Sequence, residues 1–339
     1  MLLVTGGTGL IGSHLLYELV KKGGNVRALK GKTSNTEEVR KIFSFYSANA
    51  DALFSKIEWI EGDVLDITSL EEAMAGITHV YHCAGFVSLD AKDDNKVMKI
   101  NREGTSNLVN SALAHKVKKL CYVSSVAALG SGNGKEITED TPWDSDPHSS
   151  AYALSKYLAE NEVWRGSQEG LEVVIVNPGI VIGPGNKDRS SGMIFKAASK
   201  GLRWYSQGGM GFVDVRDVAK AMVLLMNSEV KNENFILAAE NISFRKFSEL
   251  LYGSLNQPLP NKKAGRSILG LAWRVDKLRK LLTGSSLVFT KEMANYASKT
   301  LAYSNIKIKK TINIDFIPLS DSVKEAGRYF LSSYVPKKK

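Results

Sequence analysis

The sequence contains very little cysteine, since only Cys83 and Cys121 occur among its 339 residues. Two thiols cannot form a disulfide framework, and both lie in apolar runs that are typical of buried strands. Free, buried thiols are usual in proteins of a reducing compartment. We therefore expect a cytoplasmic protein that is held together by its apolar core.

Long apolar runs are also missing. No stretch of about 20 consecutive apolar residues occurs, so we expect no transmembrane segment. The chain begins with a short apolar run that leads directly into glycines, and we expect no secretory signal.

Acidic residues are fewer than basic ones, which leaves a formal net charge of +10. The basic residues are scattered, apart from three lysines at 337–339. No nucleic-acid docking motif accompanies them, so we expect no nucleic-acid partner. The charge indicates a solvated surface that also attracts anionic cofactors. We predict no metal site.

Apolar and helical patterns alternate through the first half of the chain, which predicts an α/β fold with a doubly wound parallel sheet. Strands are expected at 1–5, 25–30, 57–61, 78–83, 119–123 and 171–176, and helices at 10–22, 70–75, 95–115 and 151–165. The polar and aromatic segment 34–55 is left unassigned.

After Pro178 the pattern becomes mainly helical. We therefore expect a dinucleotide-binding domain at 1–177, with a return segment near 212–238, and a smaller substrate-binding lobe at 178–339. Residues 256–263 are expected to form a loop. Residues 266–282 are basic and amphipathic, which favours a core-facing helix, with a membrane-surface helix as the alternative.

A glycine-rich turn follows the first strand in VTGGTGLIG. Gly7, Gly9 and Gly12 fit the pattern G-x-G-x-x-G, and Gly6 extends it to G-x-x-G-x-x-G. Backbone without Cβ atoms can approach a pyrophosphate, which then lies at the N-terminus of the next helix. The predicted pyrophosphate-binding residues are Gly6, Gly9, Leu10, Ile11 and Gly12.

The segment 25–32, at the end of the second strand, lacks the carboxylate that usually binds the ribose 2′-hydroxyl of NAD. Arg27, Lys30 and Lys32 are there instead. We therefore expect Lys30 and Lys32 to favour NADP(H), with NAD(H) as the alternative. A basic surface loop without a cofactor role also fits this segment.

Small or polar residues follow the next two strands. An Asp at the position of Asp63 can bond the adenine amino group, with Val64 beside it. Ala84 and Gly85 are small enough to let a cofactor lie close. All four residues are predicted to contact the dinucleotide.

Tyr152 and Lys156 form Y-x-x-x-K in a predicted helix, so the two side chains share a face. A nearby ammonium favours the phenolate and lowers the pKa of a tyrosine. Such a tyrosine can exchange a proton with a substrate oxygen while a nicotinamide exchanges hydride. Ser125, at the end of a predicted strand, faces the same crevice and can bond that oxygen.

These features together resemble the extended short-chain dehydrogenase/reductase family, which includes NAD-dependent epimerases and dehydratases. The resemblance runs through VTGGTGLIG, HCAG, NREGTSNLVNSA, YVSSVAALG, YALSK, NPGIVIGPG and FVDVRDVAKAM. It implies Tyr152 as the acid/base, Lys156 as the ribose-binding residue and pKa modulator, and Ser125 rather than Ser124 as the donor to the substrate oxygen. It adds Asn101 as a supporting residue and Pro178 to the cofactor site. It also implies a homodimer through helices 95–115 and 151–165.

Met210 stands where the epimerase and dehydratase branch usually has an arginine that grips a nucleotide diphosphate. Together with NPGIVIGPG, this makes the chain look closer to dihydroflavonol reductases and 3β-hydroxysteroid dehydrogenases. We therefore expect a small-molecule ketone or alcohol substrate. A sugar-nucleotide epimerase or dehydratase is the alternative, with Arg189 or Arg203 replacing the missing arginine, and a regulatory NADP-binding protein is the non-enzyme alternative. Candidates for an apolar pocket wall are Met193, Trp204, Tyr205 and Phe212, which fit a lobe core equally well.

Overall fold

The computed structural model describes residues 1–144, 150–201, 203–283 and 290–334. Its central sheet has seven parallel strands in the order β10-β6-β5-β4-β1-β2-β3. Six of them match the strands expected in the first half of the chain, so the predicted doubly wound α/β fold is confirmed. The strands are β1 (Leu2–Thr5), β2 (Val26–Lys30), β3 (Ile57–Glu61), β4 (His79–His82), β5 (Lys119–Val123), β6 (Glu172–Pro178) and β10 (Glu233–Leu237).

The strand order reverses between β1 and β4, because the chain first builds outward through β2 and β3 and then returns to the other side of β1. Adjacent loops diverge at such a point and leave a crevice outside the carboxyl ends of the strands. The glycine turn after β1 and the Ala84–Gly85 segment after β4 border this crevice. The topology thus puts the predicted cofactor segments at one edge of the sheet.

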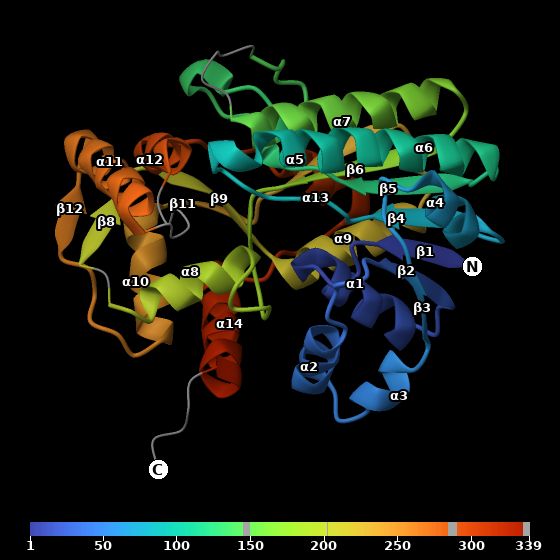
Figure 1. Ribbon diagram of the computed structural model, residues 1–339, viewed down its shortest axis with the longest axis horizontal. Helices are drawn as coiled ribbons and strands as arrows, with labels where there is room; N and C mark the ends of the chain where they lie inside the picture. Colours follow the sequence, from blue (N-terminus) through green and yellow to red (C-terminus); the bar gives the residue numbers. More distant parts are fainter. Residues whose placement is uncertain (145–149, 202, 284–289, 335–339) are drawn as a thin grey trace.

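Helices cover both faces of the sheet (Figure 1). One face carries an apolar core shared with helices on the α1 side, and the other a second core shared with helices on the α7 side. The first group is α1 (Leu10–Lys21), α2 (Glu37–Tyr46), α3 (Ala50–Phe54) and α9 (Val215–Met226), and the second is α4 (Ile67–Met74), α5 (Asp94–Met98), α6 (Gly104–Ala114) and α7 (Ala151–Gln168). The unassigned segment 34–55 therefore contains two helices, of which α2 buries Val39 and Phe43 and α3 buries Ala50.

The second half of the chain is mainly helical, as expected, but it also forms short strands that the sequence did not predict. One small sheet has the order β11-β9-β7 and another pairs β12 with β8. The strands are β7 (Ile180–Ile182), β8 (Trp204–Ser206), β9 (Gly209–Asp214), β11 (Glu240–Ser243) and β12 (Lys262–Ala264), and the helices are α8 (Ser190–Ala198), α10 (Phe244–Ser254), α11 (Arg266–Thr283), α12 (Lys291–Ser298), α13 (Ile306–Ile312) and α14 (Leu319–Tyr334). Lys262 and Lys263 thus belong to a strand and not to the predicted loop.

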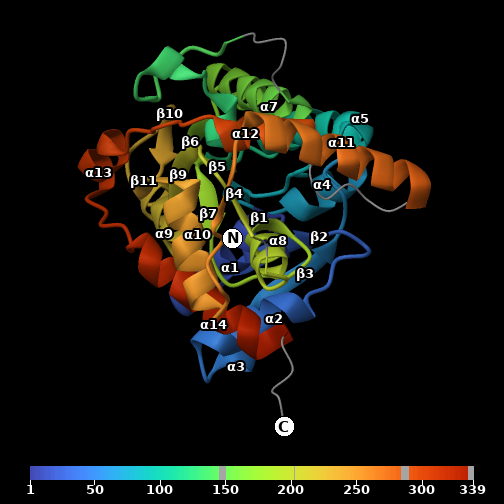
Figure 2. The same ribbon diagram turned by 90° about the vertical axis from the view of Figure 1, so that its left-hand side faces the viewer.

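Helices α11 and α12 pack against each other at one end of the molecule, as Figures 1 and 2 both show. None of the helices in the described ranges is long and apolar enough to cross a membrane.

Candidate active site

The glycine turn is shaped by close backbone approach. Gly6 has φ +67°, and a Cβ atom there would lie 2.5 Å from the backbone nitrogen of Ala84. A Cβ atom on Gly12 would lie 2.2 Å from the carbonyl oxygen of Gly6. Gly9 precedes α1 at its N-cap, where no side chain accepts a hydrogen bond from the helix. This uncapped helix start, with Leu10 and Ile11 in its first turn, fits a pyrophosphate.

The predicted adenosine end of the site contains an acidic residue close to one of its lysines, which the sequence analysis did not anticipate. Lys30 and Glu61 are paired in register at the ends of β2 and β3, and their charged groups lie 3.8 Å apart. Lys32 is exposed. Arg27 has a structural role, because its guanidinium group donates hydrogen bonds to Glu58 and to the carbonyl oxygens of Ala73 and Ala75. The positive field at this end therefore comes from Lys32 and from Lys30, which a carboxylate partly neutralises.

Asp63 and Val64 follow β3, as expected. Asp63 is exposed and its carboxylate accepts a hydrogen bond from the amide of Leu65 at 3.0 Å. Val64 is buried and touches the position where a Cβ atom on Gly104 would lie. Asp63 is thus open to an adenine amino group, while Val64 acts as packing beneath it.

Ser125, Tyr152 and Lys156 are brought together at the carboxyl end of β5. Ser125 follows β5, whereas Tyr152 and Lys156 lie in the first two turns of α7. A hydrogen bond with the Ser125 side chain favours ionisation of Tyr152, but burial outweighs it and raises the pKa of that tyrosine. Ser124 is buried, whereas Ser125 is partly exposed, so the preference for Ser125 agrees with the geometry.

The pKa of Tyr152 is raised by burial, contrary to the sequence-based expectation that Lys156 lowers it. The Lys156 ammonium group donates to the Val123 carbonyl at 2.8 Å and to the Tyr122 hydroxyl at 3.2 Å. Burial lowers the pKa of Lys156 to about 8, and the charge of Glu160 opposes this effect. The lysine is therefore anchored to β5, one helical turn from the tyrosine.

Asn101 is buried and links three parts of the site. Its side-chain amide donates to the Phe86 carbonyl and to the Ser155 hydroxyl, while its oxygen accepts from the Phe86 amide. It lies in a π-helical turn, Lys99–Glu103, between α5 and α6, and such turns are frequent at functional sites. A Cβ atom on Gly85 would lie 3.4 Å from both the Asn101 oxygen and the Lys156 nitrogen. Asn101 is thus a supporting residue that holds the segment after β4 against α7.

Glu160 is a buried carboxyl that the sequence analysis did not single out. It lies one turn beyond Lys156 in α7, and it accepts a hydrogen bond from Asn177. Asn177 also donates to the carbonyl of Ser125 at 3.2 Å and immediately precedes Pro178, which is buried at the end of β6. Burial raises the pKa of Glu160. The spacing Lys156-x-x-x-Glu160 could have identified this residue from the sequence, because it puts the carboxyl on the helix face that carries the lysine.

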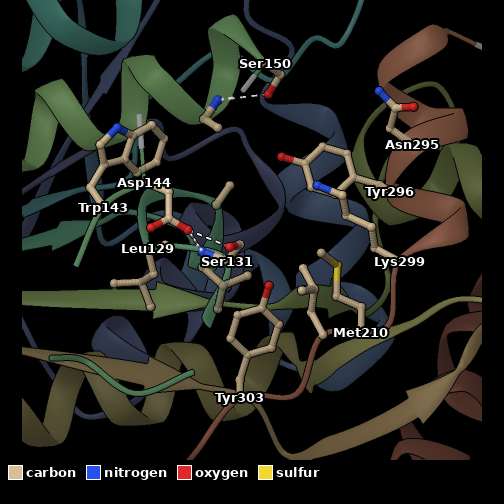
Figure 3. A pocket seen from close by; sticks show the side chains of 15 residues that line it. Leu129, Ser131, Trp143, Asp144, Ser150, Met210, Asn295, Tyr296, Lys299 and Tyr303 are labelled. Carbon is tan, nitrogen blue, oxygen red and sulfur yellow. Dashed lines mark hydrogen bonds between the residues drawn. The ribbon is translucent and has the colours of Figure 1, made fainter. Parts of the chain in front are cut away.

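A cavity of about 100 Å³ is lined by residues next to this cluster in the sequence. Figure 3 shows the side chains that line it. Its wall includes Val126 and Ala127, next to Ser125, and Ser150 and Ala153, which flank the start of α7. The hydroxyl ends of Tyr296 and Tyr303 point toward its middle, with Met210 beside Tyr303. The remaining lining residues are Leu129, Gly130, Ser131, Trp143, Asp144, Asn295, Lys299 and Leu301.

The wall of this cavity is largely apolar and aromatic, and among the described residues it contains one cation, Lys299, and no arginine. Asp144 accepts hydrogen bonds from the amide and hydroxyl of Ser131, which lower its pKa. Within the described chain, no group of three or more His, Cys, Asp or Glu side chains is placed to hold a metal ion. The cavity therefore offers mainly apolar and aromatic contacts, and its charged lining groups are Lys299 and Asp144.

The four residues expected to form an apolar wall lie outside this cavity. Phe212 is buried in the lobe core, where it stacks on Phe247 at 4.5 Å between ring centroids. Met193 and Trp204 are exposed, and Tyr205 contacts Arg245. The wall is formed instead by Met210 and by tyrosines near α12, which no local motif in the sequence identifies.

The chain is similar to a known enzyme family over more than half of its length. Residues 2–238 match the model of the NAD-dependent epimerase/dehydratase family. A putative dihydroflavonol 4-reductase of Synechocystis is 28% identical and covers 96% of this chain and 93% of its own. Tetraketide alpha-pyrone reductase 2 of Arabidopsis thaliana is 30% identical over 77% of this chain and 84% of its own. The crystal structure of gox2253 is 30% identical, covers 98% of each chain and has a TM-score of 0.81.

Proposed function

The chain belongs to the NAD-dependent epimerase/dehydratase family and is an enzyme of the extended short-chain dehydrogenase/reductase type. From this premise we propose that it is an NADP(H)-dependent reductase or dehydrogenase. Its substrate is a ketone or alcohol of low charge. The observation that carries the proposal is the Ser125, Tyr152 and Lys156 cluster beside a largely apolar cavity.

The chain's own residues support this reaction in three ways. The nicotinamide, when bound, supplies or accepts the hydride. Tyr152 gives a proton to the substrate oxygen during reduction, or takes it during oxidation, and its raised pKa keeps the hydroxyl protonated and ready to donate. Ser125 donates a hydrogen bond to the same oxygen and so stabilises the charge that develops there. Lys156 binds the nicotinamide ribose and holds positive charge near the tyrosine.

The substrate assignment rests on the wall of the cavity. An arginine can make bidentate, charge-assisted bonds to a diphosphate, and Met210 can make none. Lys299 is the one cation among the described lining residues, whereas Arg189 and Arg203 are exposed and do not line the cavity. Met210, Tyr303 and Leu301 offer apolar contact instead.

The substrate class is tested by titrating the NADPH-loaded enzyme with UDP-glucose, TDP-glucose and a panel of aromatic and alicyclic ketones. We expect NADPH oxidation with members of the ketone panel and no saturable binding of either sugar nucleotide. Micromolar binding of a sugar nucleotide, with no turnover of any ketone, would move the enzyme to the epimerase and dehydratase branch.

The coenzyme preference is tested at the end of β2. We expect NADPH to bind more tightly than NADH, because Lys32 and Lys30 attract a 2′-phosphate. Replacing both lysines by Ala should weaken NADPH binding by about tenfold, the scale of one charged hydrogen bond, and leave NADH binding nearly unchanged. Glu61→Gln removes the carboxylate beside Lys30 and should strengthen NADPH binding. Equal affinities of the wild-type protein for both coenzymes would refute the assignment.

The division of the chain and its assembly are parts of the same proposal. Residues 1–177 form the dinucleotide-binding domain, and the return segment near 212–238 adds to it, since α9 packs on α1 and β10 pairs with β6. Residues 178–339 otherwise form the substrate lobe. A homodimer would bury the outer faces of α5, α6 and α7, where Leu154 is exposed, and sedimentation velocity measures it. A cytoplasmic location fits the two free thiols, and fractionation of the source cells tests it.

A further inference from the structure

Helix α11 carries an apolar stripe that nothing in the described chain covers. On the other side of the helix, Leu269 and Trp273 pack against Ala294 and Ala297 of α12, so the expectation of a core-facing helix holds for that side alone. The stripe residues recur at helical spacing and form one face. They are Ile268, Leu271, Val275 and Leu278, with exposed fractions of 39%, 62%, 57% and 56%.

Basic residues flank this stripe. Arg274 lies one turn from both Leu271 and Leu278, and it is exposed. On the opposite flank, Arg279 lies one turn from Val275 and pairs with Asp276 at 2.8 Å. The carboxyl of Asp276 is largely covered, whereas Arg279 is partly exposed. The sequence of α11 contains five basic residues, Arg266, Arg274, Lys277, Arg279 and Lys280, against the single acid Asp276.

The segment before α11 also exposes basic and large apolar side chains. Lys262 and Lys263 in β12 are exposed, and Lys262 lies over the ring of Trp204 in the paired strand β8. Trp204 is 47% exposed, and Leu259 in the preceding loop is 56% exposed. Tryptophan and lysine side chains together are typical of surfaces that meet the boundary between lipid and water.

We propose that α11 and the β8–β12 edge dock the protein on an anionic lipid surface. The helix lies in the membrane plane with its stripe among the acyl chains, and Arg274, Lys262 and Lys263 contact lipid phosphates. The positive charge of this surface favours an anionic lipid surface over a second copy of the chain. In a dimer through this face, two basic surfaces would lie against each other and repel. Docking here needs no spanning helix, and none is found in the described residues.

The position of α11 gives the docking a consequence for the substrate. A cleft between α11 and α12 is lined by Arg266, Leu269 and Trp273 on one side and by Asn295 and Lys299 on the other. Asn295 and Lys299 also line the cavity beside Tyr152. The cleft lies on the side of α11 away from the stripe, so an apolar substrate that leaves the bilayer would pass around this helix to reach the active-site cavity. The docking itself does not depend on the proposed reaction.

The test is co-sedimentation of the full chain with vesicles. We expect binding to an equimolar mixture of phosphatidylglycerol and phosphatidylcholine, weak binding to phosphatidylcholine alone, and release by high salt. The triple variant Leu271→Gln, Val275→Gln and Leu278→Gln should weaken binding by at least about tenfold, because the stripe no longer gains from burial. Arg274→Gln should weaken it by about fivefold, the worth of one charge near an anionic surface.

Matched controls lie elsewhere on the surface. Ile67→Gln removes an equally exposed apolar side chain from α4, and Lys56→Gln removes an exposed charge before β3. Both should bind vesicles like the wild type, and every variant should bind NADPH normally. Failure of the wild type to bind anionic vesicles, or equal losses in the control variants, would overturn the proposal. A dimer that dissociates in the triple variant, without vesicle binding by the wild type, would assign the stripe to a second copy.

Discussion

Replacing Tyr152 by Phe should lower turnover by about a hundredfold or more while NADPH binding stays unchanged, because the change removes the proton donor and little else. The tyrosine lies one helical turn from Lys156, and a hydrogen bond links its hydroxyl to Ser125. The measurement is steady-state reduction of a ketone that the wild-type enzyme accepts, combined with fluorescence titration of NADPH.

The matched control is Tyr303→Phe, which removes a hydroxyl that lines the neighbouring cavity, at a position outside α7. It should change turnover by less than about tenfold, since that hydroxyl contacts the ligand without exchanging the reacting proton. Near-normal activity of the Tyr152 variant, or an equal loss in both variants, would remove Tyr152 from the role of acid/base.

The sequence predicted six of the seven strands of the central sheet, because each of these six is a local apolar or alternating run bounded by turn residues, whereas β10 was not predicted as a strand. The glycine turn and the Tyr152/Lys156 pair were also accessible, since each is a short motif whose spacing determines its geometry. Ser125 followed from its place at a strand end. These parts depend on residues close together in the chain.

The remaining features arise from tertiary contacts. Tyr296 in α12 and Lys299 directly after it line the cavity, although they lie far from Tyr152 in the sequence and no local pattern links them to it. The pairing of Lys30 with Glu61 depends on the register of β2 against β3. The amphipathic pattern of α11 predicted a helix, but the pattern could not tell which apolar side chains a neighbour covers.

The pKa of Tyr152 also depends on tertiary contacts that a local motif does not determine. The motif correctly puts a lysine one turn away, and a lysine at that distance would lower the pKa of a solvated tyrosine. In the fold, Lys156 turns to the Val123 carbonyl and burial of the phenol has the larger effect. The balance between desolvation and a neighbouring charge depends on packing, which the spacing of two residues does not report.

Gly6→Ala should be among the most damaging single substitutions in the chain, and Gly23→Ala provides its matched control. Both glycines have positive φ, +67° at Gly6 and +82° at Gly23, so both variants suffer the same backbone strain of about 1 kcal/mol. A Cβ atom on Gly23 would meet nothing within 4 Å, whereas one on Gly6 would lie 2.5 Å from the backbone of Ala84. Backbone cannot rotate away as a side chain can, so the turn after β1 must separate from the segment after β4.

We therefore expect Gly6→Ala to lower the free energy of unfolding by at least about 3 kcal/mol more than Gly23→Ala does. Urea unfolding of both variants measures the difference, and titration of the folded protein shows whether NADPH binding weakens in the Gly6 variant alone. Loss of all folded Gly6→Ala protein, with a stable Gly23→Ala protein, agrees with the expected order. Equal unfolding free energies together with equal NADPH affinities would show that the contact between these two loops constrains neither the fold nor the cofactor site.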